Sequence, residues 1–473
     1  MRRKNKGNTY MLLAVLLVLN GLFPAAVFAA EPPVEAVSAI LMDEPTGKVL
    51  FEKDADKRMF PASTTKILTA LVALDYIAED DLVVAGNEVY AVPPDSSKAG
   101  HVPGETLRGD HLFRGLMIPS GNETACVVAL EVAKRYSNDD NDDLNYAEAE
   151  RIFCGLMNEK AKSLGAVNSN FVNPHGYHDP DHYTTARDIA LITREAMKNQ
   201  LIRRIVKEKD FEGNGAGENP DPALTTQEYR WATHNELLIP GDYYYEYATG
   251  IKTGFTDEAG ASLVASAEKD GKQSIAVVFF SPDPGRWTDA KKLFDYGFET
   301  FSTETVQTKG QKLEAAAVAN PRLGDSGEIT AIANDDFSAL MSKEELSRVV
   351  SEITYNADVI APTATADEAA EPDSDKVQLK TPIAPHDVIG KITYTLDGEP
   401  LFTGNVLSGG EALERTFNTD FDFYFSQFKN AAFSLGAVPF WVGGAALLAL
   451  VIVTVRALGR KKYRRNNALR KRY

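Results

Sequence analysis

Apolar and polar residues follow two different periods between positions 34 and 302. Helical spacing of the apolar residues predicts helices over 65–76, 125–134, 149–164, 185–197 and 286–301. Shorter apolar or alternating runs predict strands over 37–42, 48–51, 261–267 and 274–280. Strands at both ends of this segment, with helices between them, indicate one α/β domain whose sheet brings the two ends together.

The pattern changes after residue 304. Residues 305–415 contain short alternating strands, such as 328–332 and 388–396, and few long helices, so we expect a small β-rich domain. Residues 356–376 interrupt it with six acidic residues and two prolines, which predicts a disordered acidic insertion.

Both ends of the chain carry apolar runs with basic flanks. Residues 1–29 have the basic start, the apolar stretch of about 14 residues and the small-residue end of a signal peptide, with an uncleaved anchor as the alternative. Residues 437–455 are 19 residues without a charge, which is long enough for a transmembrane helix. The basic residues of 456–473 predict a cytoplasmic tail, so the body faces outward, joined to the membrane by a phenylalanine-rich juxtamembrane segment, 416–436.

The net charge and the number of cysteines exclude several classes of protein. The formal net charge is -17, and because both ends are basic, the body between them is more acidic still. Such a body is a poor partner for nucleic acid. Two cysteines exclude a disulfide scaffold and a four-cysteine zinc module. Cys126 and Cys154 lie on predicted helices, and the spacing leaves buried thiols and a disulfide both open.

The first candidate motif is Ser63-Thr64-Thr65-Lys66, at the start of a predicted helix. A spacing of three places the hydroxyl and the amine on one helical face. A serine needs a base to become a nucleophile, and a lysine is such a base when its pKa is lowered. The pattern recurs at 266/269 and 426/429, so it is weak evidence alone.

Two further motifs occur once each in the chain. Ser120-Gly121-Asn122 offers a hydroxyl for proton relay and an amide for a substrate carbonyl, although both residue types are also common helix N-caps. Lys252-Thr253-Gly254 lies on a predicted strand and offers a cation and a hydroxyl for an anionic group. Its glycine allows another backbone to come close.

The three motifs in this order resemble those of the serine D-alanyl-D-alanine carboxypeptidases, the low-molecular-mass penicillin-binding proteins. The resemblance covers residues 37–301 and includes the segments 39–43, 61–66, 119–122, 171–176, 183–188 and 250–256. It implies an α/β (α+β) serine β-lactamase/transpeptidase-like catalytic domain over 30–304. The β-rich domain and the C-terminal transmembrane helix also match the family's layout.

The resemblance implies a mechanism without metal or cofactor. Ser63 would attack the carbonyl between the last two D-alanines of a peptidoglycan stem peptide, Lys66 would take its proton, and Ser120 would pass a proton to the leaving D-alanine. Asn122 would orient the peptide, Lys252 and Thr253 would hold the terminal carboxylate, and Gly254 would complete that site. The N–H groups of Ser63 and Phe255 would form the oxyanion hole. β-Lactams should acylate Ser63.

Two alternatives remain for the function. A zinc D,D-carboxypeptidase would use a cluster of histidines and aspartates, and the candidates are His175, His178, Asp179, Asp181 and His182. Pro180 lies between the second and third histidines, which predicts a loop instead of a metal-binding helix. The other alternative is an inactive cell-wall-binding module that keeps the fold without the chemistry.

Overall fold

The computed structural model describes residues 30–137, 144–217, 227–361, 377–432, 436 and 438–470. The chain divides into two compact units, Met1–Ser302 and Thr303–Tyr473. The predicted signal peptide lies outside the described residues, as does the predicted acidic insertion from residue 362 onward. Both stay predictions.

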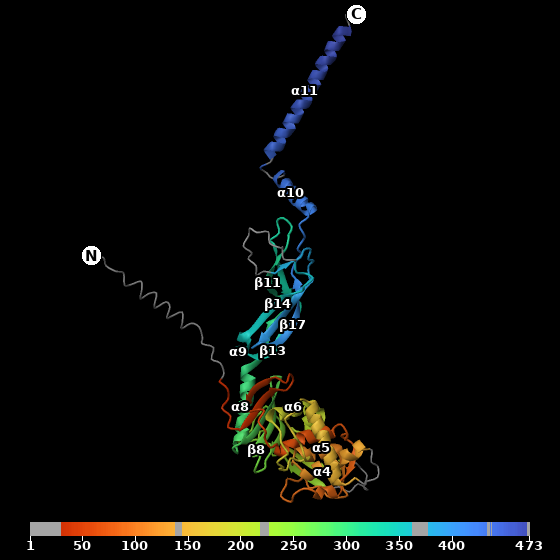
Figure 1. The fold of residues 1–473 in the computed structure, drawn as a ribbon, viewed down its shortest axis with the longest axis vertical. Coiled ribbons are helices and arrows are strands. Elements are labelled where there is room, and N and C mark those ends of the chain that lie inside the picture. The colour runs from red at the N-terminus through yellow and green to blue at the C-terminus, as the bar shows by residue number, and fades with distance from the viewer. Residues whose placement is uncertain are drawn as a thin grey trace, which may run out of the picture. The chain divides into compact units, whose positions relative to one another are not determined.

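A five-stranded antiparallel sheet forms the centre of the first unit (Figure 1). Its strands, in spatial order, are β2 (Val49–Lys53), β1 (Ser38–Asp43), β9 (Lys272–Ser281), β8 (Ala261–Lys269) and β7 (Ala248–Gly254). Strand β1 pairs with β9 from Ser38↔Phe279 to Asp43↔Ser274. The prediction that the sheet joins the two ends of this segment is therefore confirmed.

A second contact ties the same two ends together. The carboxylate of Asp289 accepts hydrogen bonds from the backbone N–H groups of Glu35 and Ala36, each at 2.9 Å. Asp289 is fully buried on the helix that follows β9. A buried carboxylate needs such donors, since its charge is otherwise unsolvated.

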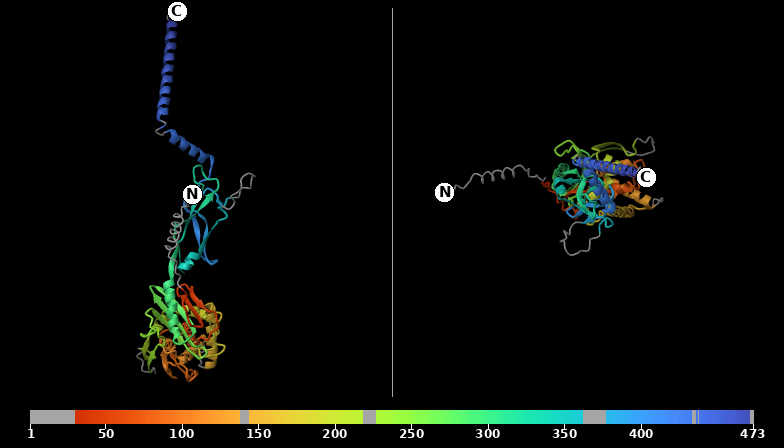
Figure 2. Two further views of the ribbon diagram at one scale, coloured as in Figure 1. Left: turned by 90° about the vertical axis from the view of Figure 1, so that its left-hand side faces the viewer. Right: turned by 90° about the horizontal axis from the view of Figure 1, so that it is seen from above.

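Helices cover the sheet. Helix α8 packs on β8 and β9, and α6 packs on β1 and β9 (Figures 1 and 2). All six residues of β1 are buried, as expected for a strand covered on both faces. The helical elements of the unit are η1 (Ala62–Thr65), α2 (Lys66–Ala73), η2 (Asn87–Tyr90), α3 (Gly109–Met117), α4 (Asn122–Ser137), α5 (Tyr146–Ser163), α6 (Ala186–Ala196), α7 (Gln200–Ile205) and α8 (Gly285–Thr300).

Helix α2 lies at the centre of the helical layer. All eight of its residues are buried, and it contacts α3, α4, α5 and α6. A helix buried on every side needs a nearly continuous apolar sequence, which the stretch after Lys66 supplies. Lys66 itself, at the first position of α2, is therefore held in the protein interior.

The predicted helices and strands of this unit agree with the structure to within a few residues. The prediction missed α3, α7 and two small hairpins, β3 (Leu82–Val84) with β4 (Thr106–Arg108) and β5 (Asp210–Asn214) with β6 (Glu228–Ala232). These elements are short, with three to nine residues each, so each contains few repeats of its period.

The second unit is rich in β-structure, as predicted. A six-stranded sheet has the order β14-β16-β17-β12-β11-β15, and β10 pairs with β13. The bounds are β10 (Phe301–Gln307), β11 (Lys312–Val318), β12 (Glu328–Ala333), β13 (Phe337–Ser342), α9 (Lys343–Arg348), β14 (Val349–Tyr355), β15 (Gln378–Leu379), β16 (Val388–Leu396) and β17 (Glu399–Ser408). Ile389, Ile392 and Val406 are among the buried residues of its core.

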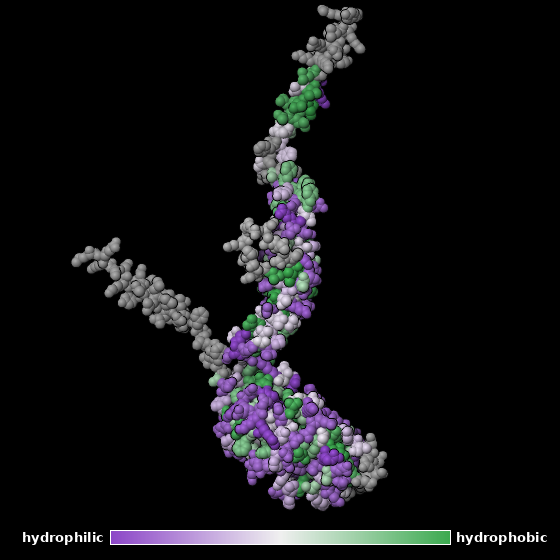
Figure 3. Space-filling model, viewed as in Figure 1, coloured by the Kyte–Doolittle hydropathy of each residue, from purple (hydrophilic) through white to green (hydrophobic). Residues whose placement is uncertain are grey.

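Two helices end the described chain, α10 (Phe417–Ala432) and α11 (Val438–Arg470). In α11, Trp441–Leu458 is long and apolar enough to cross a membrane, and none of it is buried. Figure 3 shows this stretch as a hydrophobic band. The helix continues to Arg470, beyond the end at 455 that the charge-free stretch predicts, because basic residues are good helix formers.

Candidate active site

Ser63 lies in the 3-10 turn η1, directly before α2. The backbone of Ala62 has a positive φ of 47°, and Thr64 and Thr65 donate their hydroxyls to the carbonyls of Pro61 and Ala62 at 2.7 and 2.8 Å. These local hydrogen bonds hold the turn in its strained conformation. The serine therefore has a fixed position at the start of the buried helix.

Lys66 points its amine at Ser63 from the protein interior. The Nζ lies 3.0 Å from Ser63 Oγ, 2.6 Å from Asn122 Oδ1 and 2.8 Å from the backbone oxygen of His175. Burial, followed by the positive charge of Lys252, holds the pKa of Lys66 well below 10.5. In the neutral amine, two N–H bonds satisfy Asn122 and His175, and the lone pair is left for the serine hydroxyl.

Ser120 and Asn122 come from the turn that begins α4. Ser120 has a positive φ of 63°, and its Oγ is buried without a hydrogen-bond partner among the described residues. The N–H of Asn122 donates to the carbonyl of Ser97 at 2.9 Å. A Cβ at Gly121 would lie 2.4 Å from Thr124 Oγ1, so only glycine fits between the two polar residues.

The third motif occupies the end of β7. Lys252 is almost fully buried, and burial together with the charge of Arg286 lowers the pKa of Lys252 to about 7. An anionic group bound nearby would favour its charged form. A Cβ at Gly254 would lie 3.0 Å from the oxygen of Pro61 and 3.3 Å from the nitrogen of Ser63. The end of β7 is therefore adjacent to the serine turn, as an oxyanion hole from the N–H groups of Ser63 and Phe255 requires.

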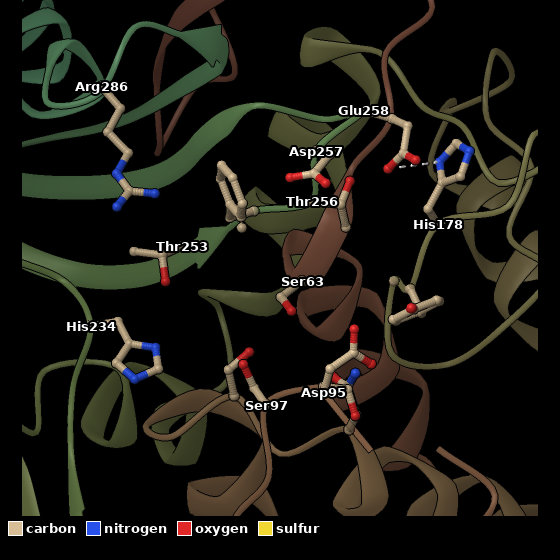
Figure 4. Close-up of a pocket in the computed structure, with 17 residues that line it drawn as sticks. Ser63, Asp95, Ser97, His178, His234, Thr253, Thr256, Asp257, Glu258 and Arg286 are labelled. Atoms are coloured by element: carbon tan, nitrogen blue, oxygen red, sulfur yellow. Dashed lines mark ion pairs between the residues drawn. The ribbon is translucent and has the colours of Figure 1, made fainter. Parts of the chain in front are cut away.

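These residues surround one cavity of about 570 Å³ (Figure 4). Of the residues predicted from the motifs, the cavity wall includes Ser63, Ser120, Asn122, Thr253, Gly254 and Phe255. Lys66 and Lys252 are buried behind this wall. Their hydrogen bonds and charge affect the residues that form the wall. Segments that lie far apart in the sequence thus meet at one place.

Sequence reasoning missed several residues of the cavity. They are Asp95, Ser96, Ser97, Tyr177, His234, Asp257, Glu258 and Arg286, whereas His178, Gly176 and Thr256, which also line the cavity, were named from the sequence without a role in this site. His234 and Arg286 lie on the side of Thr253 (Figure 4). Burial, and then the charges of Lys252 and Arg286, lower the pKa of His234. No local pattern in the sequence distinguishes His234 or Arg286.

The histidine segment is a loop, as Pro180 predicts, and the rings of His175 and His182 have hydrogen-bond partners within the protein. His182 contacts Thr65 Oγ1 through Nε2 at 2.8 Å and accepts the N–H of Val172 at Nδ1, so both ring nitrogens are used. His175 Nδ1 accepts the N–H of Tyr177. Across the described ranges, no group of three His, Cys, Asp or Glu side chains is placed to hold a metal. The zinc alternative therefore has no support. His182 instead stabilises the turn that contains Ser63, through its hydrogen bond with Thr65.

Cys126 and Cys154 are free and buried. Burial raises the pKa of each thiol to about 12, which keeps both protonated and unreactive. Of the two possibilities that the sequence left open, the structure shows buried thiols and not a disulfide.

Comparisons with known proteins show the family to which the chain belongs. Residues 25–282 match the family described as D-alanyl-D-alanine carboxypeptidase, and residues 301–413 match the C-terminal domain of penicillin-binding protein 5. The chain is 30% identical over 396 residues to the D-alanyl-D-alanine carboxypeptidase DacC of Escherichia coli, covering 80% of this chain and 86% of that one. It is 29% identical over 340 residues to DacF of Bacillus subtilis, covering 71% and 80% of the two chains.

A solved structure extends the match over both units. The crystal structure of penicillin-binding protein 5 from Haemophilus influenzae superposes with a TM-score of 0.53 at 27% identity, covering 82% of this chain and all of the other. The fold and site thus define a serine-type hydrolase with a penicillin-binding-protein-like catalytic domain and a β-rich C-terminal domain. The chain belongs to the D-alanyl-D-alanine carboxypeptidase family.

Proposed function

We propose that this protein removes the terminal D-alanine from peptidoglycan stem peptides through an acyl-enzyme on Ser63. The observation that carries the proposal is the 3.0 Å contact between Lys66 Nζ and Ser63 Oγ, made by a fully buried lysine beneath an open cavity. Burial lowers the pKa of Lys66, so its amine is neutral more readily than that of an exposed lysine and can accept the serine proton.

The proposed acylation uses the contact between Lys66 and Ser63. Ser63 Oγ attacks the carbonyl between the last two D-alanines, and Lys66 takes the hydroxyl proton. The N–H groups of Ser63 and Phe255 stabilise the oxyanion. As the C–N bond breaks, the amine of the leaving D-alanine receives a proton from Ser120, which takes up in return the proton that Lys66 removed from Ser63. Water then attacks the ester, the C–O bond to Ser63 breaks, a proton from the water returns to Ser63, and the acid is released.

Substrate orientation uses the rest of the wall. The Oδ1 of Asn122 accepts from Lys66, so its amide N–H groups are the donors that it offers to the carbonyl of the substrate backbone. Lys252 and Thr253 hold the terminal carboxylate, with Gly254 allowing the close approach of the strand. The same arrangement accepts a β-lactam, whose opened ring would remain on Ser63.

We further propose a membrane-anchored layout. Residues 1–29 are the signal peptide, 30–304 the catalytic domain, 305–415 the β-rich domain with its insertion 356–376, and 416–436 the juxtamembrane segment. Residues 437–455 cross the membrane and 456–473 form a cytoplasmic tail. The apolar stretch of α11 and the basic residues after it support this topology, with the body on the outer side.

D-Alanine release from Nα,Nε-diacetyl-Lys-D-Ala-D-Ala tests the activity. We expect release that a chelator leaves unchanged and that a β-lactam blocks while adding its mass to the peptide containing Ser63. Release that stops with chelator would instead support metal chemistry. A folded protein that neither releases D-alanine nor takes up the β-lactam would support the inactive wall-binding module.

A Ser120→Ala variant separates proton relay from a structural role. We expect kcat to fall about 10²-fold, within the usual range for a lost acid–base group. The thermal midpoint should not fall, because the buried Ser120 Oγ has no hydrogen-bond partner to lose among the described residues. The test compares the thermal midpoint and kcat of the wild type with those of the variant. A loss of stability that accompanies the loss of activity would contradict the relay role.

A further inference from the structure

We propose that Glu123, a buried residue behind the cavity, is a positioning residue for the reaction. Its carboxylate holds one wall of the cavity against the start of α4, and it stabilises the positive charge that Lys66 gains with the proton of Ser63. The inference rests on the proposed function and adds a residue that acts on the base of that same site. Glu123 does not line the cavity, so it acts through its neighbours.

Glu123 lies in the first turn of α4, directly after Asn122. It is 1% exposed, which is rare for a residue type that usually reaches solvent. The Oδ1 of Asn122 accepts a hydrogen bond from Lys66 Nζ at 2.6 Å. A shift of this turn would therefore displace a hydrogen-bond partner of the base.

The carboxylate of Glu123 joins this turn to the loop of residues 91–105. Its Oε1 accepts the N–H groups of Gly100 at 2.6 Å and of His101 at 3.3 Å. Ser97 of the same loop lines the cavity, and its carbonyl accepts the N–H of Asn122 at 2.9 Å. Two adjacent residues of α4 thus hold the loop, one through its backbone and the other through its side chain.

The hydrogen bonds to the loop do not by themselves explain a carboxylate at this position. A glutamine would accept the same two N–H groups without the cost of burying a charge. The second oxygen of Glu123, Oε2, is buried and has no hydrogen-bond partner in the part of the chain that the structure describes. Because such an oxygen costs free energy, we expect the charge to have a function besides holding the loop.

That function concerns the charge of Lys66. Burial and the positive charge of Lys252 lower the pKa of Lys66, whereas the negative charge of Glu123 raises it. When Lys66 takes the proton of Ser63, it becomes an ammonium group in the protein interior. A nearby negative charge stabilises this ammonium group, since charges interact strongly where water is excluded. Glu123 therefore favours the transfer of the proton.

The other titratable groups near Lys66 do not supply this charge. Burial lowers the pKa of His175 and of His182 to about 3. It raises the pKa of the Cys126 thiol to about 12. All three side chains are therefore neutral near pH 7, and Glu123 is the negative group among those that act on Lys66 within the described ranges.

Glu123→Gln separates the charge from the attachment of the loop. The amide oxygen can still accept from the loop, but the negative charge is lost, so the pKa of Lys66 falls further. We expect the rising limb of kcat/KM against pH to move to lower pH, because the base is then neutral at lower pH. The plateau should stay within about 10-fold of the wild type, since a weaker base takes the proton more slowly. Release of D-alanine from Nα,Nε-diacetyl-Lys-D-Ala-D-Ala by the full chain, measured across pH, gives the profile.

Glu123→Met removes the charge and the acceptor together. We expect the same displaced limb and a plateau about 10-fold below that of Glu123→Gln. This is less than the roughly 100-fold cost of a 1 Å shift at a reacting group, because Asn122 keeps its own bond to the loop. Trp231 Nε1 still donates to the carbonyl of Ala99 at 2.9 Å, so the loop stays attached to β6 and the variant should fold. Should it not fold, Glu123→Gln and the control variant decide.

The control variant is Asp289→Asn. Asp289 is also fully buried, and its Oδ2 accepts two backbone N–H groups as Glu123 Oε1 does. It is not among the groups that act on the pKa of Lys66, so we expect the wild-type pH profile. Structural damage alone would lower the rate without moving the limb. A limb that moves equally in Asp289→Asn would overturn the inference.

The outcomes also separate this inference from the proposed function. If the wild type releases D-alanine and Glu123→Gln keeps the wild-type limb, the role of the charge is refuted and the carboxypeptidase activity stands. Equal plateaus of Glu123→Met and Glu123→Gln refute the positioning of the wall. A wild-type protein that releases no D-alanine refutes the proposed function itself.

Discussion

Lys66→Met should reduce D-alanine release and acylation by a β-lactam about 10⁴-fold, the upper end of the range for a lost general base. Methionine has nearly the length of lysine and no charge, so it fits the buried site. It cannot take the proton of Ser63, whose Oγ lies 3.0 Å from the native amine. The rate of labelling by a fluorescent β-lactam measures the loss directly.

The pH profile gives an independent readout. A lysine acts as a base only when it is neutral, and the pKa of Lys66 lies well below 10.5. In the wild type, kcat/KM should therefore rise with pH through that lowered pKa, well before an exposed lysine would lose its proton. The rising limb should be absent from the residual activity of Lys66→Met. A rate that stays within 10-fold of wild type would exclude Lys66 as the base.

Lys198→Met is the matched control. Lys198 is 62% exposed in its side chain and forms an ion pair with Glu195 on the surface. We expect its rate and pH profile to equal those of the wild type, since an exposed ion pair contributes little to stability. Circular dichroism of both variants checks that the fold is retained.

Gly176→Ala should destabilise the catalytic unit by about 3 kcal/mol, among the larger effects of a single substitution. A Cβ at this position would lie 1.8 Å from the backbone oxygen of Ala62, and the backbone φ is +86°. Relief of the contact moves the turn that carries Ser63 or the Gly176 loop, whose neighbour His175 accepts a hydrogen bond from Lys66. We therefore expect kcat/KM to fall about 100-fold as well, because a shift of about 1 Å at a reacting group has that effect.

Gly165→Ala separates the two causes. Gly165 has nearly the same φ, +84°, but the nearest atom to its Cβ would be Leu191 Cδ1 at 3.9 Å. Only the backbone strain remains there, so we expect a loss of about 1 kcal/mol and normal activity. Urea unfolding of both variants, together with their kinetics, makes the comparison. Equal stability of the two variants would mean that the contact with Ala62 is relieved without cost.

The sequence predicted those parts of the site that are local in the chain. Ser63 and Lys66 are three residues apart, and the spacing alone brought their side chains together, although Ser63 lies in a 3-10 turn and not in the α-helix itself. The long periodic helices and the two hairpins of the central sheet were predicted for the same reason. Their signal is contained in a few consecutive residues.

Other parts of the site depend on contacts between distant segments. Arg286 begins a helix that packs on the sheet, and His234 follows β6, yet both reach the same cavity wall. The brace between His182 and Thr65 joins residues 117 positions apart. Such contacts depend on tertiary packing, and the periodicity of a single sequence carries no information about them.

The pairing of β1 with β9 also has a consequence for the order in which the protein is made. A chain emerges N-terminus first, so β1 and the Ser63 turn exist well before their partners. Until β9 and Asp289 have been synthesised, β1 has no neighbour on that side and the backbone of Glu35 and Ala36 has no acceptor. Lys252 arrives equally late. Ser63 therefore has its final surroundings only when nearly the whole catalytic unit has been made. A truncated product would be an unfolded chain without hydrolytic activity.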